Sequence, residues 1–446
     1  MAIKETKPQL ASRRIWIFRF LILGISSFVS LCVLEIACRM LGFAPVAEEV
    51  PKDTSKLHSA PFIRTAQENG WMYWPLEEQT IDVSDSSDGS GEQQVKLFRN
   101  RCSFREDAQE TPIKKTANTY RIMVAGDSHT DGVVENKNSY ANLLERDLNA
   151  ASSDRMTYDV INAGHTAFSP YQELWLYEKV LNKFEPDLLV VGFYAGNDVW
   201  ELMTTDRVHL AKTSDGWVHQ ESDAKSSDGG DKPSGLLGHT KHFLREHFGT
   251  YHALASIGFL RSRVGTADEP SLFDQEIAQM AQESPPIYWQ SYGQAHYFRE
   301  HPKDWEVATS KLRFTLKRFQ EEARTTQTPI MFVLIPTLHQ TCPDVARKQF
   351  DQAAKTLRLT PENTRTDDRA CELFLGLAQE IGIETIDMRP DFREFRQQHP
   401  SEQLYWQFDH HLNPAGHRVV ADRLYQRLQD KPFDADALGK QVPEQR

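Results

Sequence analysis

The chain lacks several features that would assign it to a class directly. Lys and Arg number 51 against 63 Asp and Glu, giving a formal net charge of −12. Without an excess of positive charge, binding of nucleic acid through a broad basic surface is not expected. No internal repeat is apparent in the 446 residues, and the absence of a Cys-x-x-Cys pair argues against a structural zinc site.

Cysteine is also scarce, with five in the whole chain. Cys32 and Cys38 belong to an apolar N-terminal segment, which leaves Cys102, Cys342 and Cys371. Two interpretations stay open. A Cys342–Cys371 disulfide would suit an oxidising compartment, and the alternative is three unpaired thiols.

Long apolar runs are absent except near the N-terminus. Residues 15–37 are mostly apolar, and these 23 residues are enough to cross a bilayer of about 30 Å. We therefore predict a single-pass transmembrane anchor at 15–37. Positive residues precede it at Lys4, Lys7, Arg13 and Arg14. They predict that residues 1–14 stay cytoplasmic and that the body of the protein lies on the extracytoplasmic side. A cleaved signal peptide is the alternative, but no Ala-x-Ala-like site follows the run.

After residue 120, strand-like and helix-like patterns alternate. Strands are predicted at Arg121–Ala125, Tyr158–Asn162, Leu188–Tyr194, Ile330–Ile335 and Thr385–Met388. Helices are predicted at Ser139–Leu148, Tyr171–Phe184, Ser310–Arg324, Cys371–Ile381 and Ala415–Leu428. This alternation predicts an α/β fold, a three-layer α/β/α arrangement around a parallel, doubly wound, flavodoxin-like sheet.

The remaining segments divide the chain further. We predict a linker and N-terminal flank at 38–119, the α/β domain at 120–430 and a C-terminal tail at 431–446. Residues 82–92 have the composition of a flexible loop. The alternation stops at about 200–310, which we interpret as an insertion with helical pieces at His239–Phe248 and Leu272–Gln282. It would serve either as a cap over a site or as a structural flank.

Polar residues follow the predicted strands at the edge where their carboxyl ends converge. The first strand runs into Gly126-Asp127-Ser128, the second into Asn162-Ala163-Gly164 and the third into Gly196-Asn197-Asp198. Asp409-His410-His411 precedes the last helix. Each alone is an ordinary turn or cap sequence. In doubly wound sheets, however, ligands bind beyond these strand ends.

Together these residues predict acyl transfer. A serine hydroxyl needs a base to take its proton, and the base needs a carboxylate to orient it. Ser128, His411 and Asp409 would supply these three catalytic groups. The backbone N–H groups of Ser128 and Gly164 and the side chain of Asn197 would form the oxyanion hole. No metal or organic cofactor is required.

The four motifs, in this order, resemble the SGNH (GDSL-type) hydrolase superfamily over roughly residues 120–428. The family letters map onto Ser128, Gly164, Asn197 and His411. The anchor and the insertion resemble those of membrane-attached members. The resemblance implies a serine ester hydrolase, with a small-molecule or glycan O-acyl (acetyl) ester as substrate.

One departure keeps a second activity open. The usual acid lies three residues before the histidine, where this chain has Phe408, whereas Asp409 lies two before His411. That spacing resembles the Asp-x-His of SGNH-like acetyltransferases of the alginate-acetylation kind. An O-acetyltransferase modifying envelope polysaccharide is therefore an alternative. His410 is an alternative base, although the sequence after His411 favours His411.

Two other classes of protein are possible from the sequence. A metal-dependent phosphoesterase could use Asp127 and His129 with the histidines after Asp409, but a dinuclear site needs more ligands than the intermediate strands supply. His129 is otherwise expected to be a supporting or exposed residue, and Asp127 to orient the turn. A non-catalytic, membrane-anchored module that binds envelope glycans is the other class, and the intact Ser–His–Asp set argues against it.

Overall fold

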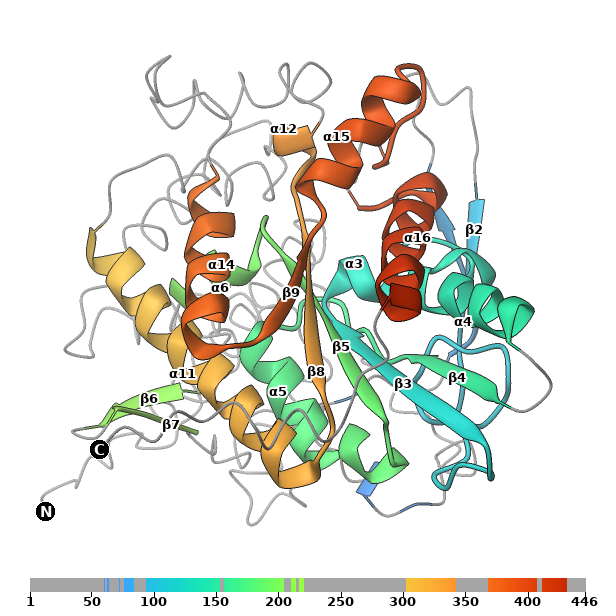
Figure 1. The fold of residues 1–446 in the computed structure, drawn as a ribbon, viewed down its shortest axis with the longest axis horizontal. Coiled ribbons are helices and arrows are strands. Elements are labelled where there is room, and N and C mark those ends of the chain that lie inside the picture. The colour runs from blue at the N-terminus through green and yellow to red at the C-terminus, as the bar shows by residue number, and fades with distance from the viewer. Residues whose placement is uncertain are drawn as a thin grey trace, which may run out of the picture. The chain divides into compact units, whose positions relative to one another are not determined.

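A five-stranded parallel sheet lies at the centre of the computed structural model (Figure 1). The structure describes residues 60, 62–63, 72, 76–83, 94–152, 156–203, 210–213, 216–219, 302–341, 368–406 and 411–430. The strand order is β4-β3-β5-β8-β9. The strands are β3 (Thr119–Gly126), β4 (Thr157–Asn162), β5 (Leu188–Tyr194), β8 (Ile330–Ile335) and β9 (Glu384–Asp387). In chain order this is 2-1-3-4-5, the flavodoxin-like doubly wound order. The predicted α/β fold is confirmed.

Helices cover both faces of the sheet, because successive strand residues point to opposite sides. Met123 and its neighbours on one face pack against α5, α11 and α14. Val124 and its neighbours on the other face pack against α4, α15 and α16. The helix bounds are α4 Tyr140–Ala151, α5 Pro170–Lys179, α11 Pro302–Thr326, α14 Arg369–Ile381, α15 Arg389–Gln398 and α16 Pro414–Asp430.

The predicted elements are present, with shifted ends. β5 and β8 have the predicted bounds, because both are continuous apolar runs that are buried throughout. The helix predicted over Tyr171–Phe184 divides into α5 and a 3₁₀ turn, Leu181–Phe184. Helix α15 is not among the predicted elements; it carries several charges and buries only Arg389 and Phe392.

Two antiparallel hairpins were also not predicted. β1 (Leu76–Asp82) pairs with β2 (Gln94–Arg99) in the flank, and β6 (Leu210–Thr213) pairs with β7 (Gly216–His219) in the insertion. The predicted anchor at 15–37 and the helical pieces at 239–248 and 272–282 lie outside the described residues. Within the ranges given above, no helix is long and apolar enough to cross a membrane.

Cys102 and Cys371 are buried free thiols. The Cys371 Sγ accepts a hydrogen bond from Gln340 Nε2 at 3.1 Å, and burial raises the pKa of both thiols to about 12. Both groups therefore stay protonated at neutral pH. The structure thus has no disulfide from Cys371, and Cys342 lies outside the described residues.

Strand β4 forms one edge of the sheet, and side chains bind its outward backbone groups. Tyr158 N–H donates to Asn149 Oδ1 at 2.9 Å, and Asn149 Nδ2 donates back to Tyr158 O at 2.8 Å. Val160 N–H donates to a Glu145 carboxylate oxygen at 2.9 Å. Asn162 N–H donates to Glu106 at 2.8 Å. Unpaired edge groups of this kind otherwise offer a template for another strand.

Arg105, from the flank before β3, is fully buried behind the segment that follows β3. Its guanidinium donates to three backbone carbonyls, Asp131 O at 2.9 Å, Gly132 O at 2.8 Å and Val134 O at 2.6 Å. It also donates to Asn136 Oδ1 at 2.9 Å and pairs with the Asp131 carboxylate at 3.2 Å. Arg105 thus fixes the course of residues 131–136.

Replacing Arg105 by methionine should destabilise the protein by about 3–5 kcal/mol, because it leaves buried carbonyls and the Asp131 charge without their partner. The free energy of unfolding from denaturant titration measures this. Lys114→Met is the control, since the Lys114 side chain is 85% exposed and its solvent-screened pair with Glu185 should contribute little to stability. Equal losses in the two variants would contradict the role given to Arg105.

Candidate active site

Ser128 begins the short helix α3 (Ser128–Asp131) directly after β3. The Asp127 side chain caps this helix by accepting from His129 N–H at 2.9 Å. Gly126 has φ of +152°, and a Cβ there would lie 2.0 Å from Thr130 Oγ1, so the tight turn requires glycine. The turn places Ser128 beyond the carboxyl end of a central strand, with 8% of its surface exposed.

His411 lies against Ser128, although 283 residues separate them in sequence. Its Nε2 is 2.8 Å from Ser128 Oγ, a hydrogen-bonding distance. In this geometry a neutral imidazole that carries its proton on Nδ1 can accept the serine proton through Nε2. The predicted nucleophile and base are therefore brought together.

Trp406 connects the His411 segment to the Ser128 turn. The Trp406 N–H donates to His411 O at 2.8 Å, and its indole Nε1 donates to Val133 O at 2.9 Å. The ring is buried, 4% exposed. The predicted acid Asp409 and the alternative base His410, which come between Trp406 and His411 in the sequence, lie outside the described residues.

Gly164 follows β4, as predicted, and packs against α3. A Cβ on Gly164 would lie 2.3 Å from Asp131 N, so a side chain cannot be accommodated without movement. Its N–H donates to Asn162 Oδ1 at 3.0 Å. In this structure the N–H predicted to bind an oxyanion is therefore hydrogen-bonded within the chain.

Asn197 follows β5 and precedes α6 (Asp198–Met203). It is 6% exposed, and its Nδ2 donates to Glu201 Oε1 at 3.4 Å. Burial raises the pKa of Asp127, and a hydrogen bond with the Asn197 side chain opposes that rise. The predicted amide donor thus contacts carboxylates beneath the serine. Ser128, as the first residue of α3, has an N–H with no carbonyl ahead of it in the helix.

Four fully buried carboxylates lie near the serine turn, and two of them, Glu173 and Glu201, are not among the predicted site residues. The four are Asp127, Glu173, Asp198 and Glu201. Burial raises the pKa of Asp127 to about 6, opposed by the His129 N–H and by the charge of His411. Burial, reinforced by neighbouring carboxylates, raises the pKa of Glu173 and Asp198 well above their ordinary values. Their charged forms are therefore disfavoured in the folded protein.

Asp131 behaves oppositely, because it has cationic partners. Burial alone would raise its pKa, but the charges of Arg99 and Arg105 outweigh burial and hold the pKa below its usual value. Thr166 Oγ1 also donates to Asp131 at 2.7 Å. Asp131 therefore stays ionised and joins the flank, α3 and the loop after β4.

The metal-dependent alternative has no ligand cluster among the residues described. No group of three or more His, Cys, Asp or Glu side chains there is arranged to hold a metal ion. Asp127 and His129 supply the Asp-x-His pattern of the sequence, but the His129 ring is stacked on Tyr194. Asp409 and His410 lie outside the ranges described.

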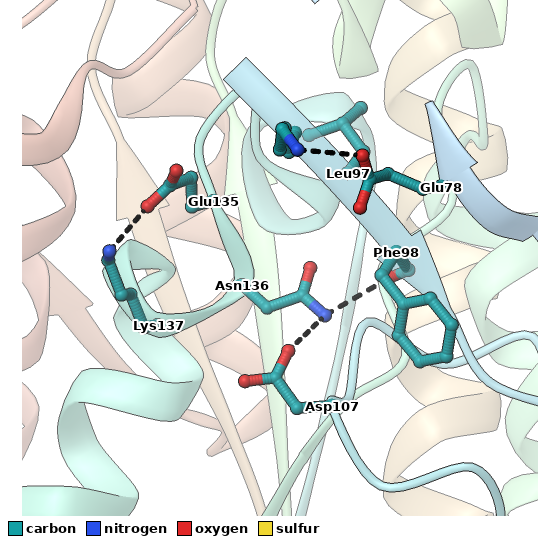
Figure 2. Close-up of a pocket in the computed structure, with 8 residues that line it drawn as sticks. Glu78, Leu97, Phe98, Asp107, Glu135, Asn136 and Lys137 are labelled. Carbon is teal, nitrogen blue, oxygen red and sulfur yellow. Dashed lines mark hydrogen bonds and ion pairs between the residues drawn. The ribbon is translucent and has the colours of Figure 1, made fainter. Parts of the chain in front are cut away.

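A separate pocket of about 220 Å³ lies between the β1–β2 hairpin and the segment after α3 (Figure 2). Its lining residues are Glu78, Lys96, Leu97, Phe98, Asp107, Glu135, Asn136 and Lys137. The two lysines pair with glutamates, and Asn136 Nδ2 donates to Phe98 O and Asp107 (Figure 2). Neither Ser128 nor His411 lines this pocket.

One family model matches part of the chain. Residues 343–446 match the model described as "SGNH hydrolase-like domain, acetyltransferase AlgX". The match includes His411 and supports the resemblance to SGNH proteins at the level of the superfamily. With the Ser128–His411 pair, it supports an ester hydrolase of the SGNH type. No curated protein matches the chain.

Several solved structures are similar to the chain at low identity. LAE5, an alpha/beta hydrolase enzyme from the metagenome of Lake Arreo, Spain, is 14% identical, with a TM-score of 0.34 over 69% of this chain and 94% of that chain. Axe2, an acetylxylan esterase from Geobacillus stearothermophilus, is 13% identical, with a TM-score of 0.33 over 71% and 95%. A lipase/acylhydrolase from Enterococcus faecalis is 11% identical, with a TM-score of 0.33 over 71% and 99%.

Replacing Glu173 by glutamine should stabilise the protein increasingly as pH rises. Both Glu173 carboxylate oxygens are buried without a hydrogen-bond partner among the described residues. Because the folded-state pKa is raised, the stability linked to protonation is fully present below about pH 4.5 and is lost as pH rises through the folded pKa. Glutamine removes this ionisation.

Thermal unfolding midpoints at about pH 5 and about pH 9 measure the effect. The midpoint of Glu173→Gln should exceed that of wild type more at the higher pH. Glu394→Gln, on the exposed face of α15, is the control and should show no such trend. A Glu173→Gln difference that is the same at both pH values would contradict the prediction.

Proposed function

We propose that the protein is a serine-dependent ester hydrolase of the SGNH type that acts on O-acyl esters, with acetyl as the expected acyl group. The observation that carries this proposal is the 2.8 Å contact between His411 Nε2 and Ser128 Oγ. A base within hydrogen-bonding reach makes a serine hydroxyl a competent nucleophile.

The proposed mechanism has two halves. Ser128 Oγ attacks the ester carbonyl while His411 takes its proton, and the resulting imidazolium then protonates the leaving alcohol. Water repeats the sequence on the acyl-enzyme, and His411 acts first as base and then as acid. Asp409, two residues before His411, would orient the imidazole. No metal or organic cofactor takes part.

The oxyanion hole is proposed to consist of the N–H groups of Ser128 and Gly164 and the side chain of Asn197. Since Gly164 N–H and Asn197 Nδ2 donate to groups of the chain itself, their use by an oxyanion requires these bonds to be exchanged. The Ser128 N–H needs no such exchange, because the first helical N–H groups have no helical acceptor. It is therefore the primary donor in this proposal.

A second candidate is an O-acetyltransferase that passes the acyl group to a sugar hydroxyl instead of water. The matching family model supports this candidate, because its description names an acetyltransferase. The Asp409-x-His411 spacing agrees with this alternative. An envelope polysaccharide would then be the acceptor, and hydrolysis and transfer would share the same acyl-enzyme.

Activity on acetylated sugars and short acyl esters tests the proposal. Ser128→Ala and His411→Asn should each lower kcat by about 10³-fold or more, because either removes a member of a catalytic unit. Both should leave thermal stability near that of wild type. Gln398→Asn, on the exposed end of α15, is a control expected to keep full activity. Full activity of Ser128→Ala would refute the assignment.

The same assay separates hydrolysis from transfer. With an acceptor glycan present, a hydrolase releases acetate, whereas a transferase forms acetylated glycan at the expense of acetate. A fluorophosphonate probe should label wild type and not Ser128→Ala, and it should not label a non-catalytic glycan-binding module.

We further propose that residues 15–37 anchor the protein in the membrane and that the catalytic domain is extracytoplasmic. The support is the apolar run and the positive residues before it. A reporter that is active only outside the cytoplasm, fused after residue 60, should be active. The same fusion lacking residues 15–37 should be inactive. Activity of a reporter confined to the cytoplasm would contradict the proposal.

A further inference from the structure

The ring of His129 contacts two other aromatic rings, and one of them is the ring of the proposed base. The His129 ring is stacked on the Tyr194 ring, with ring centroids 3.5 Å apart and planes at 27°. The centroid of the His129 ring is also 4.9 Å from that of His411, with planes at 34°. We propose that His129 is a positioning residue, which holds the His411 imidazole in line with Ser128 Oγ.

The three rings come from different elements of the chain. Tyr194 is the last residue of β5, and His129 lies in α3 next to Ser128. His129 is fully buried and Tyr194 is 1% exposed, so neither ring has room to swing away. The backbone of His129 is also fixed, because its N–H donates to Asp127. His129 and Tyr194 therefore form a rigid surface next to His411.

The reaction requires the His411 imidazole to keep one orientation toward Ser128 Oγ. The hydrogen bond from Trp406 N–H to His411 O holds the backbone of His411 and not its ring. In the proposed mechanism Asp409 orients the imidazole. A ring packed against the imidazole also restricts its rotation. Misplacement of a reacting group by about 1 Å can cost about 10²-fold in rate, so the restriction acts on kcat.

Charge reinforces the arrangement. His411 becomes an imidazolium when it takes the serine proton. Among the titratable groups nearby, Asp127 and His417 interact electrostatically with His411. Asp127 would favour the imidazolium, whereas burial lowers the pKa of His417 to about 3, so it stays neutral.

Two substitutions at one position test the inference, which rests on the proposed function. His129→Ala removes the ring, and His129→Phe keeps a flat ring in contact with Tyr194 and His411. We expect His129→Ala to lower kcat about 10–100-fold with KM changed by less than about twofold. His129→Phe should recover most of the lost kcat. A structural role alone would not predict this KM–kcat split with ring-dependent rescue.

Two results would overturn the inference. One is a kcat for His129→Ala within about twofold of wild type. The other is a folded His129→Phe as impaired as His129→Ala, since the ring would then not be the group that matters. If His129→Ala does not fold, the kcat of His129→Phe decides alone: near wild type supports the inference, and a loss of about 10-fold or more refutes it.

Histidine NMR separates this inference from the proposed function. Selective ring labelling follows the His411 resonance through a pH titration in wild type and in both variants, without any substrate. We expect a broadened and shifted His411 signal in His129→Ala, and a signal like wild type in His129→Phe. If no ester is cleaved and Ser128 is not labelled, the proposed function fails. The His411 signal still decides whether His129 positions the ring.

Discussion

Arg105 places one positive charge inside the protein, and the segment that follows α3 folds around it. The guanidinium donates to the carbonyls of Asp131, Gly132 and Val134, none of which belongs to a strand. Buried carbonyls without such partners would be costly. Arg105 comes from the flank and not from the sheet. The position of Ser128 therefore depends on residues outside the α/β body as well as on β3.

Much of the fold could be predicted because it follows from local patterns. β5 and β8 are apolar over their whole length, so their bounds follow from composition. The parallel direction of the strands follows from their alternation with helices. The two hairpins could not be predicted, because polar strands such as Leu76–Asp82 lack a clear apolar alternation. α15 was missed for the same reason, since Phe392 is its buried apolar residue.

The site was predicted in part, for a related reason. Ser128 and His411 lie in motifs whose order and spacing carry information, and they are in contact. The supporting residues have no such signal. Arg105 resembles any other arginine in the sequence, and Glu173 resembles a surface residue of a helix until its burial is known. His129 was predicted to be either a supporting or an exposed residue. Its contacts with the Tyr194 and His411 rings could be seen only in the structure.

The side chains along β4 give the sheet one closed edge. The Asn149 side chain forms the pair of hydrogen bonds that a neighbouring strand would form, since it accepts from Tyr158 N–H and donates to Tyr158 O. Glu145 and Glu106 bind the next two outward N–H groups. An extended peptide that approached this edge would have to displace a side chain for each bond that it formed with these N–H groups. Growth of the sheet by strand addition, whether with a partner or with a second copy, is thereby disfavoured on the β4 side.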